Sequence, residues 1–146
     1  MSNTIQLKVN GRQEERVAHA ALSPGHLIEV ISTGKVQKNA TEGAACAPLF
    51  AIEDALQGND VDTAYAAADP VQYVHALPGD EVNALMQAGP AYAVGEKVYS
   101  AGDGTLTDEA GLSTTTAPTI PVGIVKTALD LSGSGAVSAR TAITIL

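Results

Sequence analysis

The sequence predicts a mainly β fold, in the form of a small antiparallel β-barrel or sandwich. Short segments of alternating apolar and polar residues recur between turn signals spaced by about 8–12 residues, which is typical of such folds. Apolar residues make up 45% of the 146, but the chain has one Phe, four Tyr and no Trp, so we expect a core of small and branched side chains. Fourteen glycines and seven prolines mark the turns. This length is sufficient for one domain with its own core.

The first twenty residues predict a strand or an extended arm, and residues 21–146 predict a single β domain. Ile5, Leu7 and Val9 alternate with polar residues, as in a half-buried strand. The Asn-Gly pair at positions 10–11 that follows is a strong turn signal. The N-terminal segment is therefore expected to be distinct from the β domain formed by the rest of the chain.

The body of the chain divides into short strands. Strands are expected at 26–32, 35–40 and 47–54, and one short helix or ordered loop near residues 60–68, where alanines precede an Asp-Pro stop. The later strands are expected at 71–77, 78–86, 96–101, 105–107, 120–129 and 136–146, with a Ser/Thr-rich loop at 113–119. The segments 24–38 and 94–107 share one pattern of glycine, strand, glycine turn and return strand, and 78–89 is a looser third version. We expect reused hairpins and little helix.

Charge is unevenly distributed along the chain. Residues 1–38 hold five basic and three acidic residues, whereas residues 39–125 hold one basic residue against twelve acidic, and the whole chain has a net charge of −8. An acidic body argues against nucleic-acid binding and against anionic membranes, because both need basic surface. The single cysteine, Cys46, excludes an intrachain disulfide, and the N-terminus has no signal-peptide pattern. Synthesis in a reducing cytoplasm is expected.

The polar motifs favour structural roles over chemistry. Asp103 lies between two glycines, where a tight turn is favoured over a calcium loop because the ligand spacing is wrong. The Asp80-Glu81 pair follows Pro-Gly, where a solvated turn is favoured over an acid–base pair. His19, His26 and His75 lack zinc-site spacing. The sequence thus predicts no catalytic, metal or cofactor-binding residue, and no enzyme.

Four blocks carry a resemblance to a known family. In order they are EDALQG (53–58), DTAYAAAD (62–69), GDEVNALMQAG (79–89) and SAGDGTLT (100–107). With the C-terminal segment, they make residues 49–146 resemble tailed-bacteriophage capsid decoration proteins, also called structural cement proteins. The resemblance implies a mainly β protein without enzymatic activity on the outer surface of a virion, made in the host cytoplasm and bound to the phage major capsid protein. It also implies self-association, commonly as a homotrimer, although dimers and monomers also occur among such proteins.

The N-terminal strand is the expected contact with the capsid or a neighbouring subunit. Our hypothesis is that Ile5, Leu7 and Val9 pair with a partner by strand addition, beside Arg12 and Arg16 of the most basic segment. We expect deletion of residues 2–16 to abolish capsid binding and leave the β domain folded. The alternative is a soluble β-barrel binding module, for example one that binds carbohydrate. It would need exposed aromatic side chains for sugar stacking, and the only candidates are Phe50, Tyr65, Tyr73, Tyr92 and Tyr99.

Overall fold

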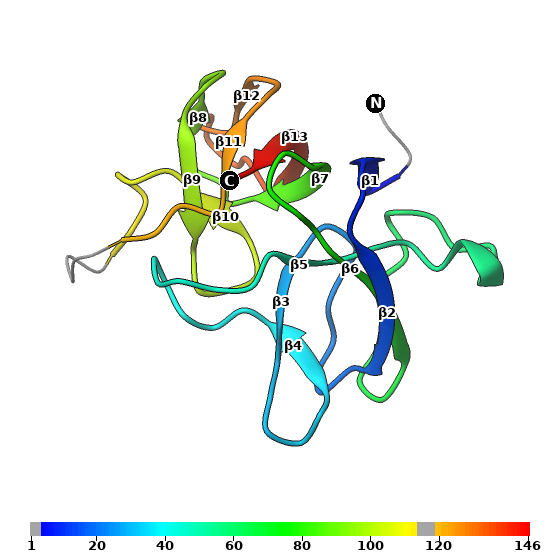
Figure 1. The fold of residues 1–146 in the computed structure, drawn as a ribbon. Helices are drawn as coiled ribbons and strands as arrows, with labels where there is room; N and C mark the ends of the chain where they lie inside the picture. The colour runs from blue at the N-terminus through cyan, green and yellow to red at the C-terminus, as the bar shows by residue number, and fades with distance from the viewer. Residues whose placement is uncertain (1–3, 114–118) are drawn as a thin grey trace.

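Two large β-sheets and one small sheet contain the strands in the computed structural model, which describes residues 4–113 and 119–146 (Figure 1). The first sheet has five strands, and a parallel bridge between Ala18 and Val36 joins its two ends. All its other pairs are antiparallel. In spatial order its strands are β2 (Arg12–Val17), β6 (Pro70–His75), β5 (Leu49–Ala51), β3 (Leu27–Val30) and β4 (Val36–Lys38).

The second sheet is a closed barrel with an added strand. Its longest ladder is antiparallel and joins β7 to β13, from Ala139 opposite Met86 to Thr144 opposite Glu81. One parallel pair, β10 with β7, completes the circle. In order around the barrel the strands are β7 (Glu81–Met86), β10 (Leu106–Thr107), β9 (Lys97–Ser100), β11 (Gly123–Val125) and β13 (Ala139–Ile145). The added strand β1 (Gln6–Lys8) pairs with the start of β7. A separate small sheet pairs β8 (Ala91–Tyr92) with β12 (Leu129–Asp130). The predicted mainly β barrel fold is confirmed.

The helical content of the described residues is one 3₁₀ turn, η1 (Ala55–Gln57), which ends at Gly58 with a φ of +74°. The segment near 60–68 is an ordered loop, the second of the two predicted forms. Of the expected Ser/Thr-rich loop 113–119, residues 114–118 lie outside the described part. None of the described helices is long and apolar enough to cross a membrane.

Two of the three expected hairpins form. Strands β3 and β4 pair antiparallel, with Val30 opposite Val36, and β9 pairs with β10, with Ser100 opposite Leu106. The third expectation, over 78–89, is wrong, because β7 is followed by β8, which pairs with β12 instead of returning along β7. Both edges of β7 are already paired, with β1 and β10 on one side and β13 on the other, so no edge is free for a return strand. Its residues 82–86 are all buried.

One large core connects the two sheets. It is built from branched and small side chains, as the composition predicts, and includes Leu27, Phe50 and Val74 of the first sheet together with Val82, Met86 and Ile143 of the second. A smaller cluster that includes Leu22, Ile28 and Tyr73 belongs to the five-stranded sheet. Burial of apolar surface, which stabilises the folded state by about 25 cal/mol per Å², is the main stabilising contribution in such a fold. The two large sheets are therefore held together by shared packing as well as by the chain connections.

Candidate functional site

The three apolar residues of the expected contact strand are in different environments. Ile5 is completely buried in the shared core, and its backbone N–H donates to Glu53 Oε2 at 3.0 Å. Leu7 and Val9 are half-buried, and β1 already pairs with β7 through Gln6 opposite Val82. Deletion of residues 2–16 would thus remove a core side chain and paired strands. We therefore expect this deletion to destabilise the rest of the fold, which differs from the expectation based on the sequence.

Arg12 and Arg16 lie on β2, opposite His75 and Val71 of β6, and both side chains are exposed. The Arg12 side chain is 83% exposed and lies 3.8 Å from Glu14. Arg16 donates from Nε to the Tyr73 hydroxyl at 3.1 Å and from Nη1 to the Gly34 carbonyl at 3.1 Å. Arg16 thus helps to hold the β3–β4 turn, whereas Arg12 is open to solvent. Their contact with a partner stays a prediction.

Asp80 occupies the crossing between the two sheets. It is 2% exposed, and its carboxylate accepts hydrogen bonds from the backbone N–H groups of Leu77, Asn10 and Gly11 at 2.8–3.1 Å. Burial raises the pKa of the carboxyl, but these hydrogen bonds outweigh it, and the pKa is lowered from its usual value. The prediction of a solvated turn is wrong for Asp80. Local turn signals do not show that the segment at Asn10 and Gly11 will cover its carboxylate. Its neighbour Glu81 pairs with Lys126 at 2.5 Å.

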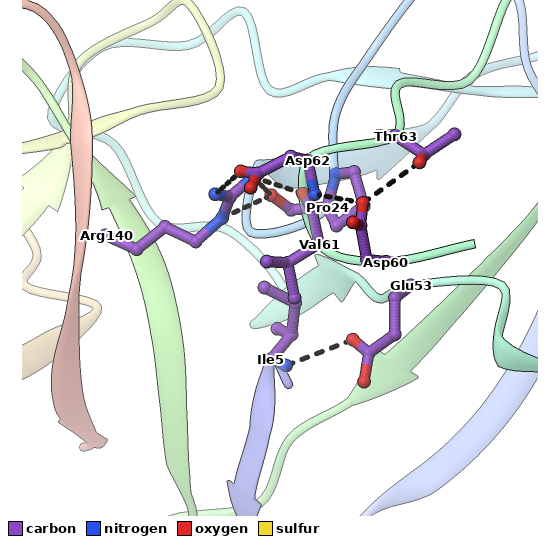
Figure 2. A network of polar contacts seen from close by, with 8 residues as sticks. All are labelled: Ile5, Pro24, Glu53, Asp60, Val61, Asp62, Thr63 and Arg140. Carbon is purple, nitrogen blue, oxygen red and sulfur yellow. Dashed lines mark hydrogen bonds and ion pairs between the residues drawn. The ribbon is translucent and has the colours of Figure 1, made fainter. Parts of the chain in front are cut away.

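Arg140 of β13 is the centre of a second junction (Figure 2). Its guanidinium donates to the Pro24 carbonyl at 3.0 and 3.1 Å, to the Val61 carbonyl at 2.5 Å, and to Asp62 Oδ1 at 2.9 Å. The Arg140 side chain is 15% exposed, so its bonds to the two carbonyls are largely screened from water, whereas Asp62 is 81% exposed. Arg140 thus fixes the loop that carries Val61 and Asp62 to the barrel. This role was not predicted from the sequence, where the only signal is a lone arginine within the otherwise uncharged strand segment 136–146.

The same loop is held by its own polar side chains and by the N-terminus. Asp60 Oδ1 accepts from the Asp62 backbone N–H and from the Thr63 hydroxyl, each at 3.0 Å, as Figure 2 shows for Thr63. The Asp54 carbonyl accepts from the backbone N–H groups of Gln57 and Asn59. With the bond from Ile5 to Glu53, these contacts order residues 53–63 from both ends.

The turn at Asp103 is an inter-sheet contact. Asp103 Oδ1 accepts from the backbone N–H of Thr105 at 3.0 Å, the use that the turn prediction gave it. The Gly104 carbonyl accepts from Leu27 N–H at 2.8 Å, and a Cβ at Gly104 would lie 2.9 Å from the Lys38 side chain. The β9–β10 turn therefore packs directly on the five-stranded sheet, at a point where only glycine fits.

The remaining candidates for chemistry are dispersed. The described residues contain no group of three or more His, Cys, Asp or Glu side chains that could hold a metal ion. Cys46 is half-buried, and burial, then the charge of Glu29, raises the pKa of its thiol. All five aromatic side chains of the chain are at most 6% exposed: Phe50, Tyr65, Tyr73, Tyr92 and Tyr99. No aromatic ring is therefore exposed on the surface for stacking against a sugar.

The chain was compared with models of known protein families and with curated proteins. Neither comparison finds a match.

Proposed function

We propose that this protein is a structural component of a tailed-phage virion, which binds the outer surface of the capsid and holds neighbouring major capsid protein subunits together. The observation that carries the proposal is the occurrence, in order, of the four sequence blocks that resemble capsid decoration proteins. The proposal includes self-association, with a homotrimer as the first expectation and a dimer as the second. In this role the chain performs no reaction.

The positions of the four blocks support the proposal. Glu53 of the first block binds the N-terminal strand, Asp62 of the second binds Arg140, and Asp80 of the third fixes the crossing of the sheets. In the fourth block, Ser100 donates to Asn39 at 2.8 Å. Each block thus contributes a contact between segments far apart in the sequence, so the residues that carry the resemblance also help to hold this fold together.

The proposed stabilisation has a simple physical basis. A specific contact typically buries about 800 Å² per partner. When one copy bridges two capsid subunits, its second contact forms at a high effective concentration, so weak individual contacts add up over the shell. Repeated bridges of this kind would oppose the outward pressure of packed DNA.

The test is co-sedimentation of the purified chain with heads that lack it. We expect saturable binding at a fixed number of copies per head, and a higher temperature of head rupture once the sites are filled. Heat-denatured chain is the control for non-specific adsorption. Failure to sediment with the heads, together with binding to a glycan array, would reject the proposal in favour of a carbohydrate-binding module.

A further inference from the structure

The loop over residues 53–63 projects away from both sheets and carries η1 at its tip (Figure 1). Residues 55–60 are all exposed, and η1 buries none of its side chains. Leu56 is 92% exposed, the most exposed of the large apolar residues in the described part of the chain. A single exposed leucine is common on protein surfaces. Leu56 differs from such residues because the loop that carries it is held in place by hydrogen bonds.

This loop is ordered without burying its tip. Arg140 binds it at Val61 and Asp62, the Asp60 side chain closes its second half, and the Asp54 carbonyl holds the 3₁₀ turn. Fixing a backbone residue costs about 1–2 kcal/mol of conformational entropy, which is usually offset by burial. Ordering before contact lowers the entropic cost of binding a partner. The loop therefore presents Leu56 in a prearranged position.

The charge around the tip restricts the kind of partner. Glu53, Asp54, Asp60 and Asp62 belong to the loop, and of these Asp62 is paired with Arg140. Residues 39–96 contain no lysine or arginine. The Asp54 side chain makes no capping hydrogen bond to the 3₁₀ turn, so its charge is available to an incoming group. Complementary charge directs such a surface to basic partners and excludes acidic ones.

We propose that residues 53–63 form a docking loop whose Leu56 inserts into an apolar pocket bordered by Lys or Arg on the outer surface of the major capsid protein. This inference rests on the proposed function. A second copy of this chain offers a basic surface only around residues 1–38, since its residues 39–125 carry twelve acidic residues against one basic, and contact with a second copy is one of the outcomes that the test below separates.

The test compares three variants in the head-binding assay, each checked for an unchanged thermal midpoint. Leu56→Gln keeps the charge of the loop and removes its apolar tip, and we expect an affinity loss of about tenfold or more. Val94→Gln is the matched control, since Val94 is 67% exposed in a turn of the other barrel, and its affinity should not change. Asp54→Lys should weaken binding several-fold at low salt, with a smaller effect at high salt because ions screen the contact.

The outcomes separate this inference from the function on which it rests. If the wild-type chain does not bind heads, both are wrong. If the wild-type chain and Leu56→Gln bind equally well, the docking loop is wrong and the proposed function stands. If Leu56→Gln instead changes the oligomeric state in sedimentation velocity and leaves head binding intact, the loop contacts a second copy and the inference is again wrong. Should Leu56→Gln fold poorly, Asp54→Lys alone decides, and unchanged binding at low salt would overturn the inference.

Discussion

Acidification from pH 7 to pH 4 is expected to destabilise the fold through His26, which lies where the two sheets meet. His26 is 8% exposed, and its Nδ1 accepts a hydrogen bond from the Ser23 backbone N–H at 2.9 Å. Burial is the main cause that lowers its pKa from 6.5 to about 4. The positive charges of Lys38 and Arg140 lower the pKa further, and the negative charge of Asp103 opposes them.

The size of the effect follows from this pKa shift. In the unfolded chain His26 binds a proton near pH 6.5, whereas in the folded chain it does so only near pH 4. Since the unfolded state binds more protons in this window, the free energy of unfolding falls as the pH is lowered through it and levels off below about pH 4. At about 1.36 kcal/mol per pKa unit, the loss from His26 alone is about 3 kcal/mol.

Urea unfolding at pH 7, 6, 5 and 4 measures the effect, with His26→Asn as the comparison. The Asn side-chain oxygen retains an acceptor for Ser23 N–H but does not titrate. The variant should therefore lack this part of the pH dependence, and the difference in unfolding free energy between the two proteins should change by about 3 kcal/mol over the series. Parallel curves for wild type and variant would refute the reasoning, because His26 would then titrate alike in the folded and unfolded states.

Three further changes test the junctions. Asp80→Ala should lower the free energy of unfolding by about 2 kcal/mol in urea titrations, because buried backbone N–H groups lose their acceptor; a loss below 0.5 kcal/mol would contradict the role given to Asp80. Gly104→Ala should cost at least about 1 kcal/mol more than Gly95→Ala, because both glycines have a φ of +87° but only the first would bring a Cβ against a neighbour; equal losses would mean that backbone strain alone matters. Arg140→Met should speed amide hydrogen exchange over residues 53–63, measured by mass spectrometry, and unchanged protection there would show that the guanidinium does not order the loop.

The hairpins could be predicted from the sequence because their information is local. Alternation in residues 27–30 and 36–38, with a glycine turn between them, is sufficient to define a pair of strands. The same holds for β9 and β10. The fold class follows from the number and spacing of such units.

The junctions could not be predicted because their partners are far apart in the sequence. Nothing near Asp80 indicates that Asn10 and Gly11 will donate to it, and nothing near Arg140 indicates that it will bind Pro24. The burial of Ile5 was not predicted for the same reason, and the sequence pattern was interpreted as a contact with a partner. The alternation of apolar and polar residues in a strand is the same whether its apolar face packs on the core or on a partner.

The closure of both sheets has a consequence for crowding. Unpaired strand edges are the usual starting point of edge-to-edge aggregation. Here the β7–β13 and β7–β10 pairs close one barrel, and the bridge from Ala18 to Val36 connects the ends of the other sheet. Within the described residues, the edges left open are those of β1, of β2 and β4 away from the bridge, and of the two-stranded β8–β12 sheet. Away from these edges, many copies held side by side at high local concentration would therefore meet through side chains, and their association there would be set by specific surfaces instead of by indiscriminate strand pairing.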